Sequence, residues 1–209
     1  MKSKINYTLY LVTDRELMTS ASIEECVGQA IVGGCTIVQL REKTVSSREF
    51  YETALRVRKL TSRFNVPLII NDRADIALAV NADGIHIGQS DLPYDALRHI
   101  AGADKVIGVS VSNLTEALAA VDMGADYLGV GAMFATSTKT NANLTSMEEL
   151  RSIREKVNIP IVVIGGINKD TIPFFNGTGI DGIAVVSAVV SQKDPAAAAQ
   201  ELKSLFLGR

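Results

Sequence analysis

The amino-acid sequence predicts an α/β fold, a (β/α)8 or TIM barrel, formed by a single domain over residues 1–209. Short apolar runs of strand length alternate with longer amphipathic stretches along the chain. Signals for helix starts precede most of the amphipathic stretches, and a similar short turn recurs before several of the apolar runs. No proline- or serine-rich linker interrupts this alternation, so we expect no domain boundary.

Eight apolar runs are expected to form the strands. They are short, continuous and rich in Val and Ile, as parallel strands buried on both faces are. In chain order they cover residues 7–13, 36–41, 67–71, 84–88, 105–110, 126–131, 160–164 and 181–186.

Helix starts are expected between these runs, at residues whose side chains cap a backbone N–H. Each pairs a capping residue with a glutamate three positions later, or with a proline at the first helical position. These starts are Ser22 with Glu25, Ser46 with Glu49, Asn113 with Glu116, Ser146 with Glu149, and Asp194 with Pro195.

A weak internal repeat favours closure into a barrel. Turns with the sequences Asn-Ala-Asp-Gly, Gly-Ala-Asp-Tyr and Gly-Ile-Asp-Gly precede the strands expected at 84, 126 and 181, and Gly33-Gly34-Cys35 precedes the second strand. Eight units with right-handed crossovers close naturally into a barrel. The alternative is an open doubly wound sheet, which would usually carry a glycine-rich loop after its first strand, where this chain has Val12-Thr13-Asp14-Arg15.

Composition excludes several classes of protein. The chain has 21 basic and 23 acidic side chains, a net charge of −2, which argues against a surface built for nucleic acid. We expect no membrane span and no signal peptide, because the apolar runs are too short and no cleavage site follows the N-terminus. Cys26 and Cys35 form no Cys-x-x-Cys motif and are expected to be buried, reduced thiols of a cytoplasmic protein.

Polar residues gather where the expected strands end, which in a barrel is the active-site end. Gln39, Arg41 and Lys43 alternate along the end of the second strand and should share one face. Two cations and an amide on one face are typical of a phosphate or diphosphate site. A solvated charged turn is the alternative that the sequence leaves open.

Two aspartates follow neighbouring strands. Asp72 comes after Asn71 at the end of the third strand, and Asp91 follows the fourth. Such a pair, together with phosphate oxygens, suits Mg²⁺. Both residues also precede expected helices, so helix capping is the alternative for each.

Further polar segments follow the later strands. Ser110 ends the fifth strand, and three hydroxyl residues and a lysine, residues 136–139, follow the sixth. Gly166 and Ser187 follow the seventh and eighth, the usual phosphate site of barrels. The alternatives are a turn serine at 110, a flexible polar loop after the sixth strand, and plain turns after the seventh and eighth. Together these segments predict two anion sites and one metal site, suited to a diphosphate and a monophosphate substrate. His86 lies within a strand and is expected to be a packed or hydrogen-bonded core residue.

With these motifs the chain resembles the thiamine-phosphate synthase (thiamine-phosphate pyrophosphorylase) family. The matching segments occur in order over nearly the whole chain, and they are specific as a set. They are residues 9–14 (LYLVTD), 38–43 (VQLREK), 70–72 (IND), 83–89 (DGIHIGQ), 108–110 (GVS), 136–139 (TSTK) and 164–167 (IGGI).

The resemblance implies a cytoplasmic transferase of thiamine biosynthesis. Hydroxymethylpyrimidine diphosphate would react with hydroxyethylthiazole phosphate, or its carboxylated form, to give thiamine phosphate and pyrophosphate. It implies that the pyrimidine diphosphate is held by Gln39, Leu40, Arg41, Glu42, Lys43, Asn71, Ser110 and Lys139, of which Arg41, Lys43, Ser110 and Lys139 would be catalytic. It implies that the thiazole phosphate is held by Thr136, Ser137, Thr138, Gly166, Val186 and Ser187, and Mg²⁺ by Asp72 and Asp91.

The sequence departs from the family pattern in one loop. Ala135 replaces an expected proline, and residues 140–143 lack the expected Gly/Pro pattern. Three rival readings remain: a thiazole tautomerase-like relative, a non-catalytic barrel that binds thiamine compounds, and a sugar-phosphate isomerase that uses Asp72 and Asp91 as acid and base. The first should lack the diphosphate cations and the aspartate pair, which are present here. The expected partners are the two small-molecule substrates, and a homo-oligomer is compatible with the sequence.

Overall fold

The computed structural model describes residues 5–135 and 144–208 and shows a closed, wholly parallel barrel. Every strand pairs with the next one in the chain, and β1 also pairs with β8. This closure confirms the predicted barrel and excludes the open doubly wound sheet. The strands are β1 (Leu9–Val12), β2 (Ile37–Leu40), β3 (Leu68–Asn71), β4 (Gly84–Ile87), β5 (Val106–Val111), β6 (Tyr127–Val130), β7 (Ile161–Val163) and β8 (Gly182–Val185).

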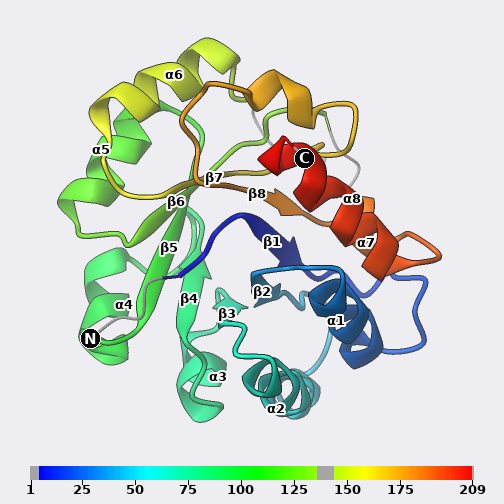
Figure 1. Cartoon of the computed structure of the whole chain (residues 1–209). Coiled ribbons are helices and arrows are strands. Elements are labelled where there is room, and N and C mark those ends of the chain that lie inside the picture. Colours follow the sequence, from blue (N-terminus) through cyan, green and yellow to red (C-terminus); the bar gives the residue numbers. More distant parts are fainter. Residues whose placement is uncertain (1–4, 136–143, 209) are drawn as a thin grey trace.

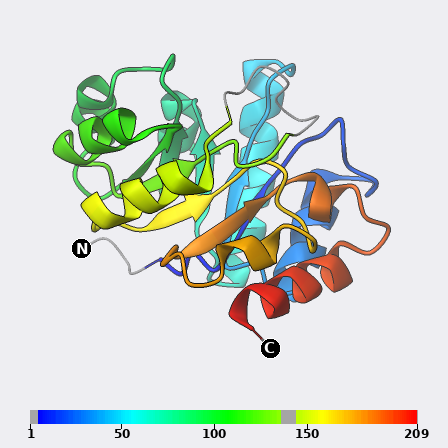
Figure 2. The same cartoon turned by 90° about the horizontal axis from the view of Figure 1, so that it is seen from above.

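Helices surround the barrel on its outside, as Figure 1 shows. They are α1 (Ile23–Val32), α2 (Ser47–Arg63), α3 (Ala74–Ala79), α4 (Tyr94–Ala101), α5 (Leu114–Asp122), α6 (Met147–Lys156), the short α7 (Ser187–Val190) and α8 (Pro195–Leu207). A 3₁₀ helix, η1 (Ile172–Phe175), lies between β7 and β8 where a full helix would be expected. In Figure 2, α8 lies beside α1, so the last helix of the chain packs against the first.

The expected helix starts are present and their capping bonds are formed. Ser22, Ser46 and Ser146 each accept a hydrogen bond of 3.1–3.2 Å from the backbone N–H three residues later. Asn113 makes the equivalent bond to Glu116 at 2.9 Å, and Asp194 caps α8 by accepting from Ala197. These side chains satisfy N–H groups that a helix start leaves without a partner, so short-range sequence signals fix where the helices begin.

Two apolar layers form the core. The inner layer fills the barrel itself and includes Tyr7, Tyr10, Ile69 and Tyr127. The larger outer layer packs the other faces of the strands against the helices. Both faces of each strand are therefore buried, which explains why the strands are continuous apolar runs rather than alternating ones.

Cys26 and Cys35 are free thiols and both are buried, as expected. Among the residues that the structure describes, no helix has both the length and the apolar character needed to cross a membrane.

Candidate active site

A cavity of about 910 Å³ opens at the carboxyl ends of the strands. This is the end of the barrel at which the sequence predicted the functional residues. The predicted residues that line the cavity are Gln39, Arg41, Lys43, Asn71, Asp72, Asp91, Ser110, Gly166, Val186 and Ser187.

Successive side chains along β2 point to opposite faces of the sheet, so only every second residue at the end of this strand reaches the cavity. Gln39, Arg41 and Lys43 line it, as the pleat of a strand predicts. Leu40 is fully buried in the outer apolar layer, and the side chain of Glu42 is bound by Arg15. Only the backbone atoms of Leu40 and Glu42 are therefore left for a ligand.

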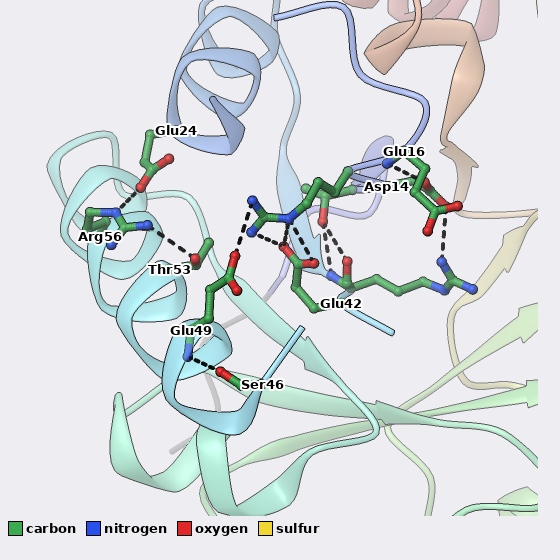
Figure 3. Close-up of polar contacts among 11 residues, drawn as sticks. Asp14, Glu16, Glu24, Glu42, Ser46, Glu49, Thr53 and Arg56 are labelled. Carbon is green, nitrogen blue, oxygen red and sulfur yellow. Dashed lines mark hydrogen bonds and ion pairs between the residues drawn. The ribbon is translucent and has the colours of Figure 1, made fainter. Parts of the chain in front are cut away.

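Two ion pairs join the loop that follows β1 to the loop that follows β2. Figure 3 shows them around Asp14 and Glu42. Arg41 Nη1 lies 3.1 Å from Asp14 Oδ2, while Arg15 Nη2 lies 2.9 Å from Glu42 Oε1. Thr13 adds a third link, since its Oγ1 accepts from the backbone N–H of Arg41 at 3.0 Å. These contacts hold the Arg41 guanidinium at the cavity wall.

Asp72 lies at the end of β3 in a left-handed backbone conformation, with φ of 61°. A non-glycine residue in this region is strained, and such residues concentrate at functional sites. Its carboxylate accepts from Asn71 Nδ2 at 2.8 Å and from the Lys43 ammonium. Asp72 thus joins the ends of β2 and β3.

Neither aspartate of the predicted metal pair caps a helix. α3 is preceded by Arg73 and α4 by Pro93, and neither of these makes a side-chain capping bond. Asp91 Oδ2 instead accepts from the backbone N–H of Gly88 at 2.7 Å within the loop after β4. The capping alternative is therefore wrong for both residues.

Asp91 and Lys43 both act on the ionisation of Asp72. Burial raises the pKa of the Asp72 carboxyl, the hydrogen bond from Lys43 lowers it, and a hydrogen bond with Asp91 raises it again, so that the pKa lies above its ordinary value. Two neighbouring carboxylates repel each other when both are ionised, and a divalent cation between them would offset that repulsion. In the described part of the chain, no group of three or more His, Cys, Asp or Glu is placed to hold a metal. A cation held by this pair would thus take its remaining ligands from substrate or water.

Ser110 lies near the end of β5, where Gln89 from the neighbouring loop donates to its backbone carbonyl at 2.7 Å. Its hydroxyl lies 2.8 Å from His86 Nε2. His86 is 8% exposed and hydrogen-bonded, which confirms the expectation of a core histidine.

The opposite wall of the cavity is built by the ends of β7 and β8. Gly166 has φ of 66°, and a Cβ there would lie 2.6 Å from Phe134 Cβ, so only glycine fits. Val186 precedes α7 and Ser187 is its first residue. Backbone N–H groups at such a helix start are available to a phosphate.

Part of the predicted site lies outside the described residues. This part is Thr136, Ser137, Thr138 and Lys139, together with the departures at 140–143. Ala135, the last described residue before them, is exposed.

Sequence reasoning gave no role to Asp14, or to the side chains of Tyr10 and Tyr127. Asp14 follows β1 and contacts Arg41, and its position directly after a predicted strand is the signal that could have found it. The two tyrosines line the cavity from inside the barrel. They lie within apolar runs, where the sequence pattern indicates only burial.

Comparison with known proteins gives a consistent result. A family model described as thiamine monophosphate synthase matches residues 9–189. The chain is 59% identical over 207 residues to the thiamine-phosphate synthase of Clostridium beijerinckii, covering 99% of each chain, and 57% identical over 209 residues to that of Ruminiclostridium cellulolyticum, covering 100% of each. A solved structure of thiamine phosphate pyrophosphorylase from Pyrococcus furiosus superposes with a TM-score of 0.90 at 42% identity, covering 97% of this chain and 96% of the other.

Proposed function

The chain belongs to the thiamine monophosphate synthase family, and we propose that its cavity joins hydroxymethylpyrimidine diphosphate to hydroxyethylthiazole phosphate, or to the carboxylated form of that phosphate. The products are thiamine phosphate and pyrophosphate, with CO₂ in addition when the carboxylated form reacts, so the enzyme is a transferase of thiamine biosynthesis that acts on small molecules. The observation that carries the proposal is that one cavity has a cationic wall and a glycine–serine wall facing a common space.

With hydroxyethylthiazole phosphate, the reaction breaks one bond and forms one. The carbon–oxygen bond of the pyrimidine diphosphate breaks, and its electron pair leaves with pyrophosphate. The electron-rich pyrimidinylmethyl cation is then captured by the lone pair of the thiazole nitrogen. This nitrogen is already a nucleophile, so the reaction needs no protein base.

The residues of the first wall stabilise the leaving group. Arg41 and Lys43 bind diphosphate oxygens as charge develops on them, and we assign the same role to Lys139, which follows β6 in the sequence. Gln39, Asn71 and Ser110 orient the pyrimidine diphosphate, and Leu40 and Glu42 contribute only backbone atoms.

Asp72 and Asp91 would hold Mg²⁺. When bound, this ion supplies positive charge to the diphosphate oxygens. The fit rests on the chemistry of the pair, since two neighbouring carboxylates provide hard oxygen ligands and leave positions for phosphate oxygens. Lys43 already donates to Asp72, so the cationic side chain and the aspartate pair would meet the same diphosphate.

The second wall suits the thiazole phosphate. Gly166 allows the phosphate to approach the backbone, and Val186 and Ser187 offer backbone and hydroxyl donors at the start of α7. Thr136, Ser137 and Thr138 complete this wall in the proposal. In this proposal the two substrates lie on opposite sides of the cavity, with their reacting atoms toward each other.

We also propose a cytoplasmic location and a homo-oligomeric state. Two free, buried cysteines support a reducing compartment. The sequence is compatible with a homo-oligomer but does not give the oligomeric state, which sedimentation of the purified protein would measure.

A pyrophosphate-release assay tests the function. Purified protein is given both substrates and Mg²⁺, and then each component is omitted in turn. Release that requires both substrates and is abolished by EDTA is expected. Release without the thiazole phosphate would contradict the coupling of the two substrates. No release from folded protein would favour the tautomerase-like or the non-catalytic alternative, neither of which the cationic wall favours.

A further inference from the structure

A chain of buried hydrogen bonds crosses the interior of the barrel and links two residues of the proposed substrate site. Gln39 Nε2 donates to Tyr10 Oη at 2.9 Å, and Tyr10 Oη lies 2.8 Å from Tyr127 Oη. Tyr127 Oη lies 2.9 Å from His86 Nδ1, and His86 Nε2 lies 2.8 Å from Ser110 Oγ. We call these five residues the Gln39–Ser110 chain.

The fold makes room for this chain at one position. In the sheet, Gly108 of β5 lies between His86 of β4 and Tyr127 of β6. A Cβ on Gly108 would lie 2.0 Å from Tyr127 Cζ and 2.4 Å from its hydroxyl oxygen. The missing side chain therefore lets the Tyr127 phenol reach across β5 to the imidazole of His86.

The donors and acceptors of the chain are consistent with one direction only. The Gln39 amide nitrogen can only donate, so the Tyr10 oxygen accepts. Tyr10 then directs its single proton to Tyr127, and Tyr127 directs its proton to His86 Nδ1. A neutral imidazole whose Nδ1 accepts carries its proton on Nε2, which donates to Ser110 Oγ.

The opposite direction leaves a buried donor without an acceptor in the chain. If Ser110 donated to His86 and the bonds ran back to Tyr10, the Tyr10 oxygen would accept from both Tyr127 and Gln39, and its own proton would have no acceptor among the five. Tyr10 is 2% exposed and Tyr127 is fully buried, so such a loss would not be offset by water. Burial also raises the pKa of both phenols, which keeps them protonated.

We propose that His86, Tyr127 and Tyr10 are positioning residues that act through Ser110: they supply its oxygen with a donor and so direct its hydroxyl proton into the cavity. There the proton meets an acceptor atom of the pyrimidine diphosphate, either a ring nitrogen or a phosphate oxygen. This inference deepens the proposed function and rests on the role given there to Ser110.

The position of the proton on His86 tests the direction without any substrate. The sequence has two histidines, so a long-range ¹H–¹⁵N spectrum of protein labelled at histidine, recorded at about pH 8 where an ordinary imidazole is neutral, contains two ring systems. His86→Gln identifies the signals of His86. Protonation at Nε2 is expected, and a proton on Nδ1 would overturn the proposed direction.

Tyr127→Phe removes the donor to His86 and keeps the ring. We expect His86 to lose its single tautomer and kcat to fall about tenfold, the effect of losing one hydrogen bond to the reacting substrate. KM for the thiazole phosphate should stay within about twofold, since the other wall is untouched. Tyr7→Phe is the matched control. It removes a hydroxyl from the same inner layer, on a ring 4.9 Å from that of Tyr127, and should leave both the tautomer and the rate unchanged.

A double-mutant cycle separates positioning from a merely structural role. If Tyr127 acts through Ser110, Tyr127→Phe should have almost no further effect on kcat in the Ser110→Ala background. An equal fall in both backgrounds would overturn the inference. If the unmutated protein shows no turnover, the proposed function fails, while the tautomer of His86 still decides the direction of the chain.

Discussion

Asp126 and Ile107 exchange two hydrogen bonds at the end of the barrel opposite the cavity. The Ile107 N–H donates to Asp126 Oδ2 at 2.8 Å, and the Asp126 N–H donates to the Ile107 carbonyl at 2.8 Å. Arg98 of α4 also binds Asp126 Oδ2 at 2.8 Å. One carboxylate therefore joins a helix, the strand β5 and the start of β6.

The same arrangement recurs before each even-numbered strand. Asp83 exchanges two bonds with Leu68 and is bound by Arg58, and Asp181 exchanges two bonds with Ile161 and is bound by Arg154. Before β2 the residue is Thr36, which exchanges its bonds with Leu9 through a hydroxyl instead of a carboxylate. The barrel is thus built from four similar units of two strands each.

Asp126→Ala should destabilise the protein by about 3 kcal/mol, because it leaves the buried Ile107 N–H without its acceptor and Arg98 without its carboxylate. For a chain of this length that corresponds to a Tm lower by roughly 6–12 °C. Thermal unfolding followed by circular dichroism measures the change. Asp122→Asn, at an exposed position on α5, is the control and should shift Tm by less than about 2 °C. A Tm for Asp126→Ala equal to that of the control would show that this carboxylate is dispensable.

The sequence predicted these turns but not what their aspartates bind. Asn-Ala-Asp-Gly and its relatives are local signals, and so are the capping serines, so both could be recognised from neighbouring residues. The partner of Asp126 is a backbone group 19 residues earlier, and an Arg–Asp pair such as Arg98 and Asp126 has no fixed spacing in sequence. Only the closed barrel brings these groups together.

In the site too, features set by neighbouring residues could be predicted from the sequence, and features set by distant residues could not. The alternation of Gln39, Arg41 and Lys43 followed from the pleat of a strand and placed all three side chains correctly at the cavity. Whether Asp72 and Asp91 cap helices could be decided only from the structure. Asp72 has a left-handed backbone conformation, and the sequence gives no sign of it because the residue is not a glycine. The role of Tyr127 was hidden because a buried tyrosine in a strand resembles any other core residue.

The buried thiol of Cys35 predicts a pH dependence of stability. Burial, reinforced by Cys26 and opposed by Lys203, raises its pKa to about 12. An unfolded thiol has a pKa of about 8.5. The contribution of Cys35 is therefore fully present below about pH 8.5 and is lost as pH rises toward about 12. The stability of the unmutated protein relative to Cys35→Ala, measured by urea unfolding, should fall by about 2 kcal/mol between about pH 7 and pH 10. A difference that does not change with pH would contradict the raised pKa.

Arg41→Ala and Lys139→Ala should each lower kcat by about 10²–10³, since each removes one cation from the developing pyrophosphate. Both variants should keep the circular dichroism spectrum of the folded protein. Arg56→Ala is the matched control: Arg56 contacts Glu24 and Thr53 on the outer helices, as Figure 3 shows, and its loss should leave kcat unchanged. Turnover near that of the unmutated protein in Arg41→Ala would remove the main support for a diphosphate site on this wall.

Gly166→Ala should act on one substrate only. A Cβ at this position lies 2.6 Å from Phe134 Cβ, so the wall proposed for the thiazole phosphate must shift, while Arg41 and Lys43 on the opposite wall keep their contacts. We expect KM for the thiazole phosphate to rise about tenfold or more, and KM for the pyrimidine diphosphate to stay within about twofold.

Gly177→Ala provides the control, because Gly177 has a similar φ of 74° but no atom within 4 Å of its Cβ position and does not line the cavity. It carries the same backbone strain, of roughly 1–2 kcal/mol, so it should lower Tm without changing either KM. An equal rise in both KM values for Gly166→Ala would mean that the two walls do not hold separate substrates.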